Sequence, residues 1–360
     1  MEKTDKQSIF LLGVAHFFVD FACTALLGAL SSQLPYAQVI ACAILYNGLA
    51  FAFQLPIGAL GDLLKQTRIF AAVGCLLVAL GSLFSSPWLL CLLIGLGNAC
   101  FHVGGGREAL KRGRGTAGPV GRFVAPGAIG IFLGPRLSRV FWVGRIALPL
   151  CLTVLAAVLM LSHKRGRQAE ALSQPPQAGS FLSLAGITAC MFLTVLLRSY
   201  MGTVLRYSFL STSLLAFLFT LSIFFGKFFG GVLADRFGTL RFCAWAQLLG
   251  VALFTLSPLW EILAYPAIFL FNTTMAITAT ELYKSLPQFP GATFGLTTFA
   301  LFLGVLPRLL GWENIFFSWW GLGLLSFVSA ALLLGGLILK TGGGNDAQIS
   351  GAVPGTDAAP

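Results

Sequence analysis

Two long stretches without a charged residue place the strongest limit on what this chain can fold into. No Asp, Glu, Lys or Arg occurs from residue 21 to 61 or from residue 69 to 106. Water-soluble domains carry about 25% charged residues, whereas this sequence carries 10% and has a mean hydropathy of +0.88. Because a helix needs roughly 20 apolar residues to cross a bilayer, each stretch is long enough for two such helices. The sequence therefore predicts an all-α polytopic membrane protein.

Proline and small polar residues divide the apolar sequence into twelve predicted transmembrane helices, six in each half. Pro35 divides the first stretch and Ser85–Pro87 the second, and a basic, glycine-rich loop is expected from Gly104 to Arg114. The predicted domains are an N-terminal half (1–162), a cytoplasmic linker (163–179), a C-terminal half (180–340) and a disordered tail (341–360). The predicted helices are 9–31, 36–60, 69–84, 87–102, 117–135, 142–161, 180–200, 207–232, 241–257, 262–281, 292–309 and 314–339.

The distribution of basic residues predicts the orientation of the chain. Lys and Arg accumulate in cytoplasmic loops of membrane proteins, so the net charge of +11 indicates topology and gives no reason to expect nucleic acid. Fifteen basic residues fall on the side of the N-terminus and five on the other, which places both termini in the cytoplasm. The two sets are Lys3, Lys6, Lys65, Arg68, Arg107, Lys111, Arg112, Arg114, Lys164, Arg165, Arg167, Arg236, Arg241, Lys284 and Lys340 against Arg136, Arg139, Arg145, Arg206 and Arg308.

A short pattern occurs twice in one register, 173 residues apart. Gly58-Ala-Leu-Gly-Asp62 follows the second predicted helix, and Gly231-Val-Leu-Ala-Asp235 follows the eighth. A repeat offset by about half the chain length indicates two related halves. Glycine lets two helices approach closely, and an aspartate is favourable against a helix N-terminus.

Twelve helices in two halves, each with a Gly-x-Leu-x-Asp turn after its second helix, resemble the major facilitator superfamily of transporters. The second turn is close to the family signature, whereas the first has Leu63 at the position of Arg236 and lacks the glycine that follows. The resemblance implies that these turns take part in gating. The gating residues it implies are Gly58, Asp62, Arg68, Gly231, Asp235, Arg236 and Arg241.

Three further segments carry weaker resemblances. Ala125-Pro126-Gly127, continuing to Gly134-Pro135, is similar to the Gly/Pro-rich fifth helix of antiporters in this superfamily, which would favour export; packing of a kinked helix explains it equally well. Ala15-His16-Phe-Phe-Val-Asp20 and Phe101-His102-Val-Gly-Gly resemble the fosmidomycin-resistance-like branch of exporters.

Asp20 is the individual residue that most strongly suggests function. It lies near the middle of the first predicted helix, where a carboxylate is costly unless it faces a partner, a cavity or a proton path. His16 lies four residues earlier, on the same helix face. We expect Asp20 to be the proton-coupling site and His16 its partner; a static ion pair between helices is the alternative.

The resemblance places helices 1, 4, 7 and 10 around a central substrate cavity, and these helices carry polar residues. Arg198 could bind an anionic group, pair with Asp20 or reach the outer interface. His102 is expected to cap the end of helix 4, and Lys227 to reach the membrane surface from helix 8. The predicted cavity residues are Thr24, Asn98, Thr194, Arg198, Asn272, Thr273 and Thr274.

The sequence favours a secondary active transporter of a small molecule, proton-coupled and exporting, that works by alternating access. It is not expected to be an enzyme, and no cofactor, metal site or nucleic-acid partner is predicted, because no phosphate-binding motif or local His/Cys metal spacing occurs. We expect a monomer in a bacterial plasma (inner) membrane. The alternatives are a membrane-embedded enzyme and a non-transporting sensor on a transporter fold.

Overall fold

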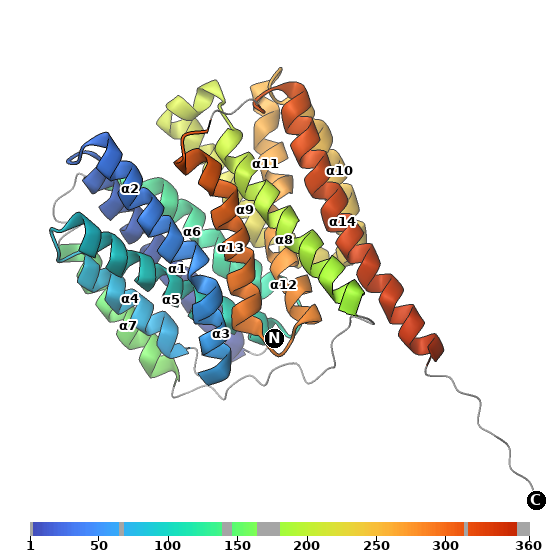
Figure 1. Cartoon of the computed structure of the whole chain (residues 1–360), viewed down its shortest axis with the longest axis horizontal. Helices are drawn as coiled ribbons and strands as arrows, with labels where there is room; N and C mark the ends of the chain where they lie inside the picture. The colour runs from blue at the N-terminus through green and yellow to red at the C-terminus, as the bar shows by residue number, and fades with distance from the viewer. Residues whose placement is uncertain (1–2, 65–67, 139–145, 164–180, 313–315, 351–360) are drawn as a thin grey trace, which may run out of the picture.

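The chain folds into a bundle of helices arranged as two side-by-side groups (Figure 1). The structure, a computed structural model, describes residues 3–64, 68–138, 146–163, 181–312 and 316–350, and its regular elements there are all helical. Figure 1 shows the N-terminal group in blue to green and the C-terminal group in yellow-green to red. Among the described residues, nine helical segments are long and apolar enough to cross a membrane.

Six helical segments form the N-terminal group. The second of them is composed of α2, a single π-helical turn (η1) and α3, one after another. Two of the segments, α4 and α7, are shorter apolar helices. The elements are α1 (Lys3–Ser31), α2 (Tyr36–Asn47), η1 (Gly48–Ala52), α3 (Gln54–Leu64), α4 (Arg68–Gly81), α5 (Pro87–Gly113), α6 (Gly118–Leu137) and α7 (Leu148–His163).

The C-terminal group repeats this order with six further segments, which confirms the predicted twelve helices in two halves. The elements are α8 (Phe181–Val204), η3 (Ser208–Ser211), α9 (Ser213–Phe237), α10 (Thr239–Leu256), η4 (Glu261–Leu263), α11 (Ala264–Asn272), α12 (Met275–Ser285), α13 (Pro290–Leu309) and α14 (Trp319–Ser350). Most of the predicted linker (164–179) and the end of the predicted tail (351–360) lie outside the described residues. Helix α14 continues to Ser350, ten residues past the predicted boundary.

Helix α5 corrects one prediction, because the expected basic loop at 104–114 is helical as far as Gly113. Its glycines admit aromatic rings: a methyl group on Gly105 would meet the Phe123 ring, and one on Gly106 the Phe294 ring. Three of its charged side chains, those of Arg107, Glu108 and Arg112, are buried and paired. Arg107 binds Asp62 at 2.8 Å, and Arg112 binds Asp5 and Glu108. Charge and glycine suggested a loop, but both are used for packing inside the bundle.

The predicted tenth helix is broken between α11 and α12. The three residues at the break turn their side chains back onto α11: Asn272 binds the carbonyl of Ile268, Thr273 that of Leu270, and Thr274 that of Phe271. Such side chains compete with the helix for its own hydrogen bonds. Inside a membrane, irregular backbone is tolerated where protein or a cavity covers it.

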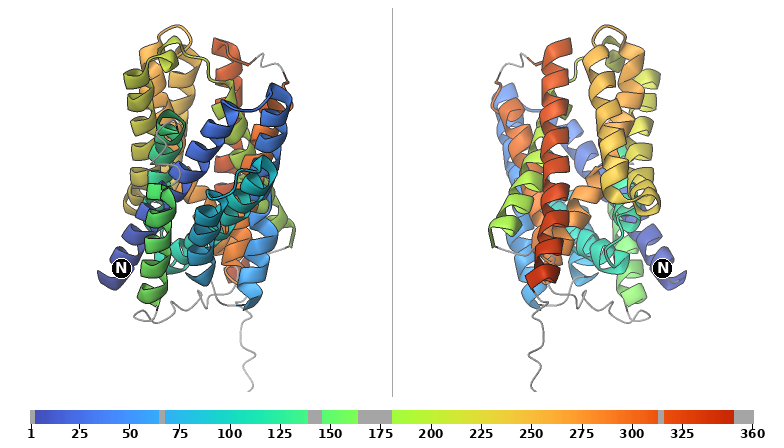
Figure 2. Two further views of the ribbon diagram at one scale, coloured as in Figure 1. Left: turned by 90° about the vertical axis from the view of Figure 1, so that its left-hand side faces the viewer. Right: turned by 90° about the vertical axis from the view of Figure 1, so that its right-hand side faces the viewer.

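The start of α1 and the end of α14 lie at the same end of the bundle (Figure 2), and glycine residues bring the two halves together there. A methyl group on Gly58 of α3 would collide with the backbone of Gly291 on α13, and one on Gly231 of α9 would collide with the backbone of Ala117, just before α6. These two backbone contacts close the bundle at this end.

Candidate functional site

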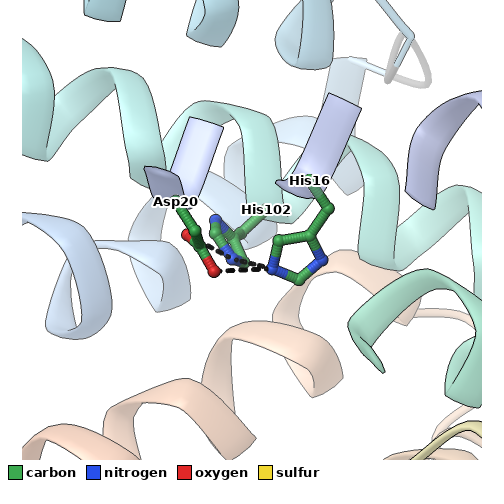
Figure 3. A group of neighbouring side chains, drawn as sticks. All are labelled: His16, Asp20 and His102. Atoms are coloured by element: carbon green, nitrogen blue, oxygen red, sulfur yellow. Dashed lines mark hydrogen bonds and ion pairs between the residues drawn. The ribbon is translucent and has the colours of Figure 1, made fainter. Parts of the chain in front are cut away.

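A buried cluster of three titratable side chains lies within the N-terminal half. His16 and Asp20 come from α1 and His102 from α5, and Figure 3 shows the three side chains turned toward one another. The Nε2 atoms of the two histidines are 2.9 Å apart, and Asp20 Oδ2 lies 3.1 Å from His16 Nε2. Asn98 donates to Asp20 Oδ1 at 3.2 Å. All four residues are at most 7% exposed.

The Nδ1 atom of each imidazole ring is bound to a backbone carbonyl group, on the side of the ring away from Asp20. His16 Nδ1 lies 2.8 Å from the Phe123 carbonyl of α6, and His102 Nδ1 lies 2.9 Å from the Asn98 carbonyl one turn earlier in α5. The fit against α6 is tight, since a methyl group on Gly127 would collide with both Asp20 and His16. The rings are therefore fixed with their Nε2 atoms toward the carboxylate.

These contacts limit how protons can be arranged in the cluster. A carbonyl oxygen only accepts, so Nδ1 must carry the hydrogen in both rings, and a neutral ring has no second N–H. Two neutral rings would then direct lone pairs at each other across 2.9 Å. One more proton on Nε2 of His16 removes that repulsion, because His102 and Asp20 can both accept from it. The contacts of the cluster are therefore satisfied when one proton lies between the two Nε2 atoms, beside the carboxylate.

His16, Asp20 and His102 are also residue types that bind transition metals, and their facing atoms lie within 4.8 Å of one another. Tetrahedral zinc with bonds of about 2.0 Å would keep two nitrogens roughly 3.3 Å apart. The 2.9 Å between the two Nε2 atoms is the length of a hydrogen bond. That no metal is bound stays a prediction from the sequence.

A cavity of about 190 Å³ lies in the C-terminal half, beside the break between α11 and α12. Arg198 of α8 and Lys227 of α9 both line it, together with Asn272. The Arg198 side chain is 9% exposed, donates to the Phe271 carbonyl and lies over the Phe271 ring at 5.0 Å. Among the described residues, neither cation forms an ion pair.

The predicted cavity residues are placed in three different environments. Arg198 and Asn272 line the cavity, whereas Asn98 binds Asp20. The others donate to carbonyls of their own helices and are absent from the cavity wall. They are Thr24, Thr194, Thr273 and Thr274.

The two aspartates of the repeated turns make matching contacts across the halves. Asp62 accepts from the backbone N–H groups of Gly291 and Ala292, each at 2.9 Å. Asp235 accepts from those of Ala117 and Gly118, each at 2.8 Å. Each carboxylate therefore caps a helix of the other half.

The basic residues of these turns lie apart from the caps. Arg236 is exposed and lies over the Phe237 ring, and Arg241 is exposed. The Arg68 side chain is outside the part of the chain that the structure describes. A role of these three arginines in gating stays a prediction from the sequence.

Two functional candidates were missed by sequence reasoning. His102 was expected to be a helix cap, yet it meets His16 across the helix interface. Lys227 was expected at the membrane surface, yet it lines the cavity. A signal for His102 was present, because the two segments that resemble the fosmidomycin-resistance-like branch are the ones that supply His16, Asp20 and His102.

Comparison with known proteins identifies the fold but not a close relative. No protein-family model matches the sequence, and no curated protein matches it. The structure is similar to a variant of the Escherichia coli fucose:proton symporter FucP, with TM-score 0.61, 16% identity and coverage of 95% of this chain and 99% of that chain. It is also similar to the major facilitator superfamily transporter FucP in the outward conformation, with TM-score 0.66, 15% identity and the same coverage. The chain is thus an all-α integral membrane protein of the major-facilitator fold.

Proposed function

We propose that the protein is a member of the major facilitator superfamily that transports a small molecule by alternating access, driven by protons. The observation that carries this is the buried cluster of His16, Asp20 and His102. A carboxylate and two imidazoles facing one another within membrane-spanning helices mark a proton path or relay. The fold supplies two halves that can rock around a site between them.

The groups around the cluster suit reversible protonation. Asn98 of α5 donates to the carboxylate, and α6 contributes Gly127 together with the carbonyl and the ring of Phe123. The remaining titratable groups that interact with Asp20 are Cys23 of α1, Tyr46 of α2 and Lys227 of α9. An imidazole ring can both donate and accept a proton, and here two rings lie beside a carboxylate, so the cluster offers neighbouring groups between which a proton can move.

The caps at Asp62 and Asp235 support alternating access. They join the halves at the end that the basic residues place in the cytoplasm, so we propose that this arrangement is closed to the cytoplasm. Opening that end breaks the four hydrogen bonds that backbone N–H groups donate to the two carboxylates, and these can form again when it closes.

A liposome experiment tests the proposal. Purified protein is reconstituted with a pH-sensitive dye inside, a pH gradient is imposed, and a panel of small metabolites is added. We expect at least one compound to dissipate the gradient with the wild type but not with Asp20→Asn. Glu261→Gln is the matched control, because Glu261 is a partly exposed carboxylate outside the cluster that accepts a hydrogen bond from Ser208.

Unchanged proton flux in Asp20→Asn would contradict coupling through this cluster. Turnover of a panel compound without any gradient would instead favour a membrane-embedded enzyme. The direction, export or uptake, follows from which orientation of the gradient drives accumulation; export stays the prediction from the sequence.

A further inference from the structure

We propose that the cavity of the C-terminal half binds the carboxylate of a small amphiphilic anion between Arg198 and Lys227. The inference rests on the proposed transport function and specifies its substrate class. It starts from the charges around the cavity, which are not balanced by the protein itself.

Two cations and one carboxylate occupy the interior where the cavity and the cluster lie. Arg198 and Lys227 repel each other, and the carboxylate that attracts Lys227 is Asp20 in the other half. Charges buried within a membrane protein are found paired with opposite charges or with substrate. Because Asp20 also lies 3.1 Å from His16 Nε2, it does not balance both cations, and a bound anion supplies negative charge between them.

The residues of the cavity wall indicate that the ligand also has an apolar part. Besides the two cations, the polar side chains on the cavity wall are those of Asn272 and Ser199. The rest of the wall is apolar, with Ile223, Ile268 and Leu301 among its residues. A ligand with a charged head and an apolar body satisfies both parts of this wall.

The break in the tenth helix places helix ends at the same cavity. Arg198 donates to the Phe271 carbonyl near the end of α11, so part of its donor capacity is used to position it. Met275, the first residue of α12, lines the cavity. Interrupted helices whose N-terminal ends face anionic groups recur in transporter substrate sites.

The anion site and the proton site are linked electrostatically through Lys227. This ammonium group interacts with both Asp20 and His102. A proton gained by the cluster makes the surroundings of the cavity more positive, and so it strengthens anion binding. By linkage the anion favours protonation to the same extent, so the arrangement favours moving proton and anion together over exchanging them.

Binding of hexanoate to the purified full chain tests this inference, with hexanamide as the uncharged match. Isothermal calorimetry in detergent at about pH 8 and about pH 6 keeps hexanoate largely ionised. We expect hexanoate to bind more tightly than hexanamide, and more tightly at the lower pH. Arg198→Met and Lys227→Met should each weaken hexanoate binding by roughly 30-fold or more.

Matched variants separate the site from general effects. Arg136→Met removes an exposed cation outside the cavity wall and should leave binding unchanged, while Arg198→Lys keeps the charge if Arg198→Met does not fold. Asp20→Asn removes the competing carboxylate and should tighten hexanoate binding at about pH 8. Equal binding of acid and amide, no binding of hexanoate, or equal losses in Arg136→Met and Arg198→Met would each overturn the proposal.

This assay needs neither a membrane nor a gradient. Selective anion binding without any proton flux in liposomes would therefore contradict the transport function alone. Proton-coupled flux of other compounds without hexanoate binding would contradict the anion site alone.

Discussion

The aspartates of the two repeated turns both cap a helix of the opposite half, but only the first aspartate also binds a buried arginine. Asp62 and Asp235 each accept two backbone N–H groups from the start of a helix in the opposite half. Asp62 also binds the buried Arg107 at 2.8 Å, whereas Asp235 is exposed and forms no ion pair among the described residues. The turn that departs more from the family signature is thus the more strongly held one.

The comparison shows which parts of the signature the interface uses. Glycine and aspartate are kept in both turns because the close approach and the cap require them. Asp62 has a basic partner in Arg107 of α5, whereas Arg236, at the position that Leu63 has in the first turn, lies over the Phe237 ring and apart from Asp235. The cap therefore forms with or without a basic partner beside the aspartate.

Replacing the two aspartates gives the largest expected difference between the turns. Asp62→Asn leaves Arg107 buried without its carboxylate, which costs about 3–5 kcal/mol. Asp235→Asn weakens a cap at an exposed position, which costs about 1 kcal/mol. Thermal unfolding of the purified variants should show a clearly larger loss for Asp62→Asn. Equal losses would mean that Arg107 adds nothing to the first turn.

Removing both members of the buried pair should restore part of that loss. In Asp62→Asn with Arg107→Met no charge remains unpaired, so we expect the double variant to be more stable than Asp62→Asn alone by about 1–3 kcal/mol. The same unfolding measurement checks it. Strict additivity of the two single changes would show that the pair is not coupled.

Substitution of Gly58 and Gly231 tests the close backbone approach that both turns make to the opposite half. A methyl group at Gly58 or Gly231 meets backbone of the opposite half, so Gly58→Ala and Gly231→Ala should each cost about 1–3 kcal/mol by overpacking. Both should also favour separation of the halves at this end, read as faster labelling of cysteines introduced there. Gly48→Ala is the control, since a methyl group there meets no atom within 4 Å. Faster labelling in the control as well would contradict a local effect.

Placing an arginine at position 63, as in the second turn, should have the smallest effect on stability. Leu63 is 77% exposed, so Leu63→Arg adds a solvated charge beside a cap that already has Arg107. We expect a change within about 0.5 kcal/mol, and the same for Arg236→Gln in the second turn. A gain of more than 1 kcal/mol for Leu63→Arg, a threshold at roughly twice the usual range for surface changes, would show that the first turn lacks a needed arginine.

The sequence predicted those features that depend on local spacing. The twelve helices follow from runs of apolar residues, and the contact of His16 with Asp20 follows from their separation of one helical turn, which the structure confirms at 3.1 Å. The repeated aspartates were found because they share a register.

Features that depend on distant partners were not predicted. His102 lies 86 residues from His16, and Arg107 is 45 residues from Asp62, so neither pairing has a local pattern. The continuation of α5 was missed for the same reason. Its glycines and charges resemble a loop until the rings and carboxylates that meet them are known.

Phe123 touches the buried cluster of His16, Asp20 and His102 and also the opposite half of the molecule. Its carbonyl accepts from His16 at 2.8 Å, while its ring fills the space above Gly105 and lies 6.2 Å from the Phe294 ring of the opposite half. A movement of the His16 ring therefore acts directly on a residue that packs against the opposite half. Phe123 alone connects the cluster to the contact between the halves, without further residues in between.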